Sequence, residues 1–189
     1  FMKQNINLIW SIYCDLPFSK NFSFTTKFFS LLNIIFSHFR RVKKITFCTS
    51  SGIDNHKHYF FNSKKTITQY LGIDKNLKFI NFKRKLFRES QGIDNQKIIF
   101  GNLGRFDKEK DHKNLFKSFN LFKNSINGKE CYLFCAGPGI SLNNKELSNL
   151  FNKYIEKKFH KFVKFFDYLD DIEQFYSSID IFVLSSVNE

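Results

Sequence analysis

Six charged side chains crowd into one short segment of this sequence. The segment "GRFDKEKDH", residues 104–112, holds Arg105 and Lys110 together with a further lysine, two aspartates and a glutamate. Arginine and lysine are the side chains that bind phosphate groups most effectively in proteins. Charged loops are also commonly no more than solvated turns, so the residues around the segment must decide between these two interpretations.

The flanking elements favour phosphate binding. Residues 97–104, "KIIFGNLG", form an apolar run with β-branched residues that ends in glycine, which predicts a buried strand. Beyond the loop, apolar residues recur at helical spacing from 115 to 122, and Asp111 is placed to cap that helix. In open α/β sheets ligands bind at the carboxyl ends of strands, where helix amino termini present free N–H groups to anions. We therefore predict that Arg105 and Lys110 hold phosphate.

The composition is that of a soluble globular protein. The chain has 189 residues, of which 42% are hydrophobic and 25% charged, so it can bury a core and is not disordered as a whole. Cys14, Cys48, Cys131 and Cys135 show no metal-ligand spacing and follow no secretory signal, which predicts reduced, mostly buried thiols in the cytoplasm. Cys131 and Cys135 fall on one face of a predicted strand and are expected in the core.

The net charge of +13 is unevenly distributed. Residues 1–94 hold 16 basic and 5 acidic residues, whereas residues 95–189 hold 14 and 12. Such asymmetry is typical of a surface that meets nucleic acid or anionic lipid, although an AT-rich genome also encodes this excess of lysine, asparagine and phenylalanine. Most of the 27 phenylalanines lie on apolar stripes, which favours a core over a base-stacking surface, so no nucleic-acid partner is expected.

Residues 25–44, "TTKFFSLLNIIFSHFRRVKK", combine an apolar helix with a basic end. Phe28, Leu32, Ile35 and Phe39 share one helical stripe, and four basic residues follow within 40–44. The apolar run is too short to span a bilayer. It is either a core helix whose basic end suits the helix dipole, which we favour, or an interfacial helix on anionic lipid.

The second half of the sequence shows repeated strand–helix alternation. Strands are predicted near residues 98–100, 132–135, 162–166 and 179–184, and helices over 111–126, 144–157 and 171–177. This order predicts a parallel sheet covered by helices. The glycine turn "AGPGI", residues 136–140, follows the second strand and lacks the spacing of both the P-loop and the dinucleotide fingerprint.

Several blocks of the sequence together resemble a known family. Their order and spacing are similar to the nucleotide-binding domain of a family-four (group 1) glycosyltransferase of the GT-B fold. The blocks are "GNLGRFDKEKDHKNLFKSF" (101–119), "LFCAGPGISLNNKEL" (133–147), "YLDDIEQFYSSIDIFVLSS" (168–186) and the final "SSVNE". In the first half, "CTSSGIDNHKHYF" (48–60) resembles the segment before the interdomain linker, and "YLGIDKNLKF" (70–79) resembles the linker motif, with Leu71 where the family has asparagine.

The resemblance implies an α/β fold of the GT-B type, with Rossmann-like parallel sheets and helices on both faces, present as a fragment of two domains. Residues 1–80 would form the C-terminal part of the acceptor-side domain, 81–94 an interdomain connector, and 95–189 a truncated donor-binding domain. The implied enzyme is a retaining glycosyltransferase that moves a sugar from a nucleotide-sugar to a saccharide or lipid-linked acceptor in bacterial surface polysaccharide or lipopolysaccharide synthesis. It would act in the cytoplasm, peripherally on the inner face of the membrane, and the fragment alone would be inactive.

The resemblance also assigns roles to individual residues. Arg105 and Lys110 would stabilise the diphosphate leaving group, and Glu189 would face the donor sugar, with a surface acid as its alternative. Donor-binding positions would be Gly104, Gly137, Gly139 and Asp171. Gly137 and Gly139 would either line the nucleotide crevice by their backbone or merely turn the chain, and Asp171 is also well placed to cap the following helix. No metal or other cofactor is expected, because the two cations would stabilise the diphosphate, which agrees with the absence of an Asp-x-Asp motif after a predicted strand.

Two other functional classes remain open from the sequence. Another GT-B enzyme, such as a phosphorylase or a nucleotide-sugar epimerase, shares the fold without the chemistry. A non-catalytic, basic polyanion-binding module would explain the charge. His112 invites a catalytic role, but its position in the sequence predicts a contact at the helix start.

Overall fold

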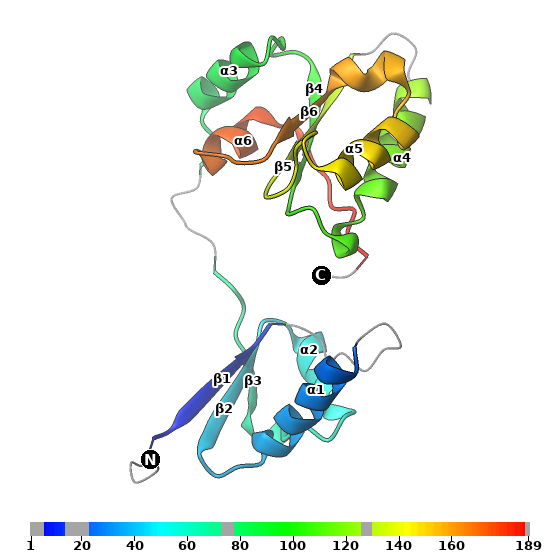
Figure 1. Cartoon of the computed structure of the whole chain (residues 1–189). Coiled ribbons are helices and arrows are strands. Elements are labelled where there is room, and N and C mark those ends of the chain that lie inside the picture. The colour runs from blue at the N-terminus through cyan, green and yellow to red at the C-terminus, as the bar shows by residue number, and fades with distance from the viewer. Residues whose placement is uncertain (1–5, 14–22, 73–77, 126–129, 188–189) are drawn as a thin grey trace. The chain divides into compact units, whose positions relative to one another are not determined.

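The computed structural model describes residues 6–13, 23–72, 78–125 and 130–187 and divides the chain into two compact units, Phe1–Asp74 and Lys75–Glu189 (Figure 1). Each unit is an α/β layer structure built on a parallel sheet. The predicted fold class is thereby confirmed.

The first unit has a three-stranded sheet in the order β1-β2-β3. Its elements are β1 (Leu8–Ile12), α1 (Phe24–Ser37), β2 (Val42–Phe47), α2 (Ser50–Lys57), the 3₁₀ turn η1 (Ser63–Lys65) and β3 (Thr66–Thr68). The central strand β2 supplies most of the core, since Val42, Ile45 and Phe47 are buried together with Phe61, and Trp10 packs against this cluster.

Helix α1 presents its large apolar side chains outward. The described residues of the helix that are buried are Ser30 and Ser37, whereas Phe28 and Ile35 are 49% and 48% exposed. The hydroxyl groups of both serines donate to carbonyl oxygens of their own helix, at 2.9 and 2.6 Å, so these small side chains need no other partner against the sheet. The helix packs on the core as we preferred, through Ile34 and the two serines, but the prediction that its apolar stripe faces the core is wrong, because hydrophobic spacing identifies a stripe and not the side on which the sheet lies.

The second unit has a four-stranded sheet in the order β6-β5-β4-β7. Its helices and strands are α3 (Asn81–Ser90), β4 (Ile98–Leu103), α4 (His112–Ser125), β5 (Cys131–Ala136), α5 (Lys145–Tyr154), β6 (Val163–Phe166), α6 (Ile172–Ser178) and β7 (Ile181–Phe182). The 3₁₀ turns η2 (Lys108–Lys110) and η3 (Lys157–Phe162) lie in two of the connections. The predicted alternation of strands and helices is confirmed.

Helices cover both faces of the second sheet, with α4 and α5 on one side and α3 and α6 on the other (Figure 1). Strand β5 separates the two cores, since Cys131 and Cys135 pack with α4 and α5, whereas Phe134 packs with Phe175 of α6. Both cysteines are free and buried, as predicted, and burial raises the pKa of each thiol. A strand that is buried on both faces is expected in a parallel sheet.

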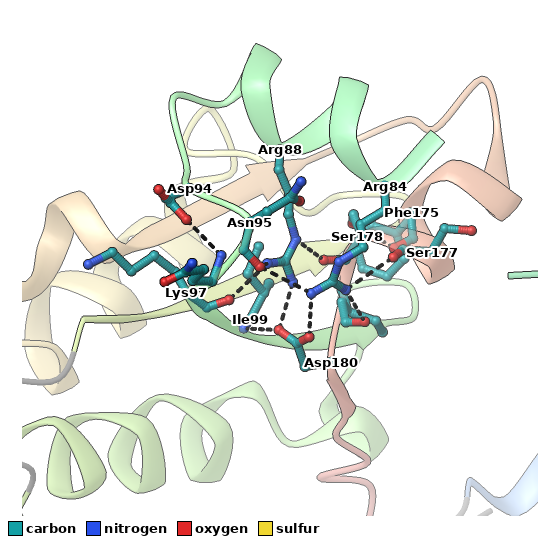
Figure 2. Close-up of polar contacts among 12 residues, drawn as sticks. Arg84, Arg88, Asp94, Asn95, Lys97, Ile99, Phe175, Ser177, Ser178 and Asp180 are labelled. Atoms are coloured by element: carbon teal, nitrogen blue, oxygen red, sulfur yellow. Dashed lines mark hydrogen bonds and ion pairs between the residues drawn. The ribbon is translucent and has the colours of Figure 1, made fainter. Parts of the chain in front are cut away.

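Helix α3, which falls within the predicted interdomain connector, packs against α6 within the second unit. Its Arg88 side chain is fully buried and reaches the start of β4 and the segment before β7 (Figure 2). The guanidinium donates to the carbonyl oxygens of Ser178 and Lys97, both at 2.8 Å, and to Asp180 Oδ2 at 2.6 Å. These bonds fix α3 to the amino-terminal edge of the sheet.

Asp180 is the shared acceptor of this cluster. Its Oδ1 pairs with Arg84 at 2.6 Å, and its Oδ2 accepts the Ile99 N–H at 2.8 Å in addition to Arg88 (Figure 2). Burial alone would raise the pKa of Asp180, but the Ile99 amide and the two arginines hold it below its usual range. The carboxylate is therefore charged and fully partnered at neutral pH.

Candidate functional site

The predicted phosphate loop lies at the carboxyl-terminal edge of the second sheet, where the loops after β4 and β5 meet. The Gly104 N–H donates to the carbonyl oxygen of Ala136 at 2.9 Å, and the Phe106 N–H donates to that of Pro138 at 2.8 Å. These bonds continue the β4–β5 pairing beyond the ends of the strands. The charged loop is thus held along one side by backbone hydrogen bonds.

Gly137 permits this close approach. Its φ is +131°, and a Cβ added at this position would lie 2.5 Å from the Gly104 carbonyl oxygen. Its N–H donates to the Phe166 carbonyl oxygen at 2.9 Å, which links the β5 loop to the end of β6. Glycine is required here for backbone packing between loops.

Gly139 is held by a carboxylate from the loop after β6. Its N–H donates to Asp167 Oδ1 at 2.6 Å, and its φ is +79°. The Gly139 carbonyl oxygen accepts the Asn144 side-chain amide at 3.0 Å. The amides of Gly137 and Gly139 therefore already donate to acceptors within the chain, which favours the turn-forming role over the nucleotide contact that the sequence left equally open. Asp167 was missed in the sequence, although an acid directly after a strand could have indicated it.

The acidic residues of the charged loop shape its turns. Asp107 accepts the Glu109 N–H at 3.0 Å, and this bond, with Arg105 as a weaker influence, holds its pKa below the usual range. Asp111 has a left-handed backbone, φ 43°, and its Oδ1 accepts the Asn114 N–H at 3.1 Å. The predicted capping role of Asp111 is therefore confirmed.

Arg105 and Lys110 stand at the two ends of this turn. The Arg105 side chain is 67% exposed, and its Nε lies 3.3 Å from Asp107 Oδ2. An ion pair as exposed as this contributes little and opens readily. The Lys110 methylene chain runs past Gly104, since a Cβ added at Gly104 would lie 3.6 Å from Lys110 Cδ. Gly104 therefore lies directly beside the alkyl chain of the second cation.

The segment after β7 is bonded to the same loop. Ser185 Oγ donates to the Lys110 carbonyl oxygen at 2.7 Å, and the Val187 N–H donates to the Glu109 carbonyl oxygen at 2.9 Å. Asn102, at the end of β4, donates to the Val183 carbonyl oxygen at 2.9 Å. Glu189, the third predicted catalytic residue, lies outside the described residues.

Asp171 begins helix α6. Its Oδ1 accepts the Gln174 N–H at 3.1 Å, and its Oδ2 pairs with Lys83 of α3 at 2.6 Å. The hydrogen bond from Lys83 and, to a lesser extent, the Gln174 amide lower the pKa of Asp171 below its usual range. The predicted capping role of Asp171 is therefore confirmed, and both of its carboxylate oxygens are used to start α6 and tie it to α3.

His112 is the first residue of α4 and is almost completely buried between the rings of Phe106 and Phe116. Among the described residues neither of its ring nitrogens has a hydrogen-bond partner. Burial lowers the pKa of His112, so the ring is neutral at pH 7. It lines a groove of 740 Å³ between α4 and α5, on the side where Leu150 and Lys153 also lie.

Within the described ranges, no group of three or more His, Cys, Asp or Glu side chains is arranged to hold a metal ion. The same residues include no helix that is both long and apolar enough to cross a bilayer.

Comparison with known proteins gives a consistent result. Residues 83–189 match the family model described as "Glycosyl transferases group 1". A curated relative, the O-antigen biosynthesis glycosyltransferase WclY of Escherichia coli, is 30% identical over 141 residues, which cover 74% of this chain and 36% of WclY. The chain thus spans about a third of the length of this relative.

Solved structures share the fold at low sequence identity. Anabaena Alr3699/HepE, in complex with UDP and glucose, superposes with a TM-score of 0.76 at 18% identity, over 95% of this chain and 46% of that one. WaaG, a glycosyltransferase involved in lipopolysaccharide biosynthesis, superposes with a TM-score of 0.75 at 16% identity, over 98% of this chain and 52% of that one.

Proposed function

The chain belongs to the group 1 glycosyl transferases, and from this premise we propose that it is part of an enzyme that transfers a sugar from a nucleotide-sugar to a saccharide or lipid-linked acceptor. The observation that carries the proposal is the pair Arg105 and Lys110 at the carboxyl ends of the parallel strands, in a loop anchored by backbone bonds from Gly104 and Phe106. This is the edge at which open α/β sheets bind their ligands.

The chemistry follows from charge. Breaking the bond between sugar and nucleotide leaves a diphosphate whose negative charge grows in the transition state, and fixed cations lower the energy of that state. The glycine amides at 137 and 139 are already used within the chain, so the cationic side chains supply the stabilisation in this proposal. Arg105 exchanges its exposed contact with Asp107 for the diphosphate at small cost.

Fixed cations make a metal ion unnecessary, and we propose that the reaction proceeds without a metal or other cofactor. We further propose that transfer retains the anomeric configuration. Glu189, which lies outside the described residues, would then orient hydroxyl groups of the donor sugar beside the diphosphate.

The relatives suggest the substrates. HepE was solved with UDP and with UDP-glucose, so a uridine diphosphate sugar is the first donor to test. WclY is named for O-antigen biosynthesis and WaaG for lipopolysaccharide biosynthesis, which supports a surface saccharide as the acceptor. We place this reaction in the cytoplasm, with peripheral contact between the enzyme and the anionic inner face of the membrane.

Calorimetric titration with UDP tests the phosphate role of the two cations. Arg105→Ala and Lys110→Ala should each weaken binding by roughly tenfold, because each removes a charge-assisted bond to phosphate. Lys108→Ala is the matched control, since it removes an exposed lysine from the same loop. Unchanged affinity in either variant would show that the residue does not bind the diphosphate. Release of UDP from a UDP-sugar, and the anomeric configuration of the product by NMR, test transfer and its stereochemistry separately.

A further inference from the structure

The segment that follows β7, residues 183–187, is bonded to the end of β4 and to the charged loop, and we call it the post-β7 segment. Its first residue, Val183, is bonded to β4 through both of its backbone groups. The Val183 N–H donates to the Gly101 carbonyl oxygen at 2.8 Å, and the Val183 carbonyl oxygen accepts the Asn102 side-chain amide at 2.9 Å. The segment therefore starts from a fixed point at the carboxyl end of β4.

The two ends of the charged loop have different anchors. The first end is held by backbone hydrogen bonds to the loop after β5. The second end is held by the post-β7 segment, since Ser185 Oγ donates to the Lys110 carbonyl oxygen at 2.7 Å and the Val187 N–H donates to the Glu109 carbonyl oxygen at 2.9 Å. Of these two bonds, the one from Ser185 comes from a side chain and can be removed by substitution.

The turn η2, which contains Lys110, is weakly closed by its own hydrogen bonds. It is a single 3₁₀ turn, a geometry in which hydrogen bonds are poorly aligned. The Lys110 N–H lies 3.2 Å from the Asp107 carbonyl oxygen, and the Asp111 N–H lies 3.3 Å from that of Lys108. Asp111 has a φ of 43°, in a region that few residues other than glycine adopt. An anchor at the Lys110 carbonyl oxygen therefore stabilises a turn that is weak by itself.

The position of the Lys110 ammonium depends on the position of its backbone. The alkyl chain passes beside Gly104, since a Cβ added at Gly104 would lie 3.6 Å from Lys110 Cδ and 3.8 Å from Lys110 Cε. A displacement of the turn would move this alkyl chain away from Gly104. Lysine acts on phosphate as a point charge at the end of a flexible chain, so its contribution depends on how well that chain is held.

Two roles are open to the Ser185 hydroxyl. It could stabilise the second unit in general, or it could set the position of Lys110. The geometry favours the second role, because the acceptor is the carbonyl group of Lys110 itself, 75 positions away in the sequence. Ser185 is also only half-buried, and a hydrogen bond that remains near water adds little to the stability of a fold.

We propose that Ser185 is a positioning residue for Lys110, and that its hydroxyl holds η2 so that the Lys110 ammonium faces the diphosphate of the donor. The bond goes to the backbone of the loop, so Ser185 acts on the ligand through the lysine. This role rests on the proposed function, since Lys110 must bind the diphosphate for its position to matter. The post-β7 segment thereby contributes to the donor site through a cation that it does not itself carry.

Calorimetric titration of the chain with UDP measures the effect of the hydroxyl. Ser185→Ala should weaken UDP binding roughly threefold to tenfold, because it removes one hydrogen bond that holds the cation in place. Ser185→Thr keeps a hydroxyl and should stay within about twofold of the original affinity. The matched control is Ser90→Ala at the end of α3, which removes a hydroxyl that donates to the Phe87 carbonyl oxygen at 2.7 Å and should leave the affinity unchanged.

A double-variant cycle separates positioning from general stabilisation. In a Lys110→Ala background, Ser185→Ala should have no further effect on UDP affinity, because the cation whose position it sets is gone. A hydroxyl that only stabilises the second unit would give the same change in affinity in both backgrounds. Circular dichroism shows whether each variant is folded.

Hydrogen exchange tests the turn without any ligand. The Asp111 amide closes η2 by donating to the Lys108 carbonyl oxygen. Its exchange should accelerate roughly threefold to tenfold in Ser185→Ala, because the turn loses an anchor and opens more often. The exchange rate should stay unchanged in Ser90→Ala.

Two results in folded variants would overturn the positioning role. One is unchanged UDP affinity in Ser185→Ala while Lys110→Ala weakens binding. The other is an equal loss of affinity from Ser185→Ala with and without Lys110. Both results leave the phosphate role of Lys110 intact and concern Ser185 alone. If Lys110→Ala itself leaves UDP affinity unchanged, the phosphate role of Lys110 in the proposed function is wrong, and the positioning role of Ser185 is wrong with it.

Discussion

The carboxylate of Asp167 accepts the backbone N–H of Gly139 at 2.6 Å and thereby joins the loops after β6 and β5. A glycine turn with positive φ at a strand end would otherwise offer its amide to an anionic ligand. Here the chain supplies the anion itself. Because this amide is already bonded, the proposed function assigns phosphate binding to the side chains of Arg105 and Lys110 and not to backbone amides.

Replacement of Asp167 by alanine should loosen the glycine turn. Hydrogen exchange of the Gly139 amide should accelerate roughly tenfold in Asp167→Ala, because the N–H loses a charged acceptor worth about 1.5 kcal/mol. Asp167→Asn keeps an acceptor oxygen and should stay within about threefold of the original rate. Equal acceleration in both variants would mean that the negative charge, and not the hydrogen bond, holds the turn.

Replacement of Gly137 by alanine should destabilise the second unit more than the same change at Gly92. Both glycines have positive φ, +131° and +69°, but a Cβ at Gly137 would meet the Gly104 carbonyl oxygen at 2.5 Å, whereas a Cβ at Gly92 meets nothing within 4 Å. Gly92→Ala should cost about 1 kcal/mol for backbone strain alone, and Gly137→Ala roughly 1–3 kcal/mol more for the overlap. Urea denaturation followed by circular dichroism measures both, and equal costs would contradict the assigned overlap.

Much of the second unit could be predicted from its sequence, because the residues that determine each strand and helix lie close together in the sequence. The run 97–104 is apolar enough to be buried on both faces, and Asp111 lies close to the Asn114 amide that it caps. Both features depend on neighbours within a few positions. The position of the charged loop at the edge of the sheet followed from the order of these elements alone.

The features that could not be predicted depend on distant parts of the chain. Arg88 and Asp180 are 92 positions apart, and nothing local distinguishes this buried arginine from the exposed Lys85 on the same helix. The Gly139 amide and Asp167 are 28 positions apart. The prediction of which side of α1 faces the sheet was wrong for a related reason. The buried side carries two serines, whereas the phenylalanines dominate the hydrophobic pattern of the sequence.

Arg88→Ala should be among the most destabilising changes in the second unit. The change removes the hydrogen bonds that the buried guanidinium donates to three carbonyl oxygens and one carboxylate oxygen. Removal of one partner from a buried ion pair costs about 3–5 kcal/mol. Lys85→Ala, on the exposed side of α3, should change the free energy of unfolding by less than about 0.5 kcal/mol. A cost below about 1 kcal/mol for Arg88→Ala in urea denaturation would show that Arg84 can replace it on Asp180.

Low pH should weaken the contacts that Glu156 makes between α4 and η3. Lys158, Asn124 and Asn120 all donate to this carboxylate, and together they lower its pKa from 4.5 to about 2. Because the pKa is lower in the folded chain, the contribution to stability is complete above pH 4.5 and is lost as the pH falls towards 2.

Glu156→Gln removes this titration but keeps an oxygen for the asparagine donors. The thermal midpoint of the variant should therefore fall less steeply than that of the original chain between pH 4.5 and pH 2. Glu146→Gln, on the exposed side of α5, is the matched control and should leave the slope unchanged. Parallel pH profiles for Glu156→Gln and the original chain would show that the contacts seen at Glu156 do not stabilise the fold in solution.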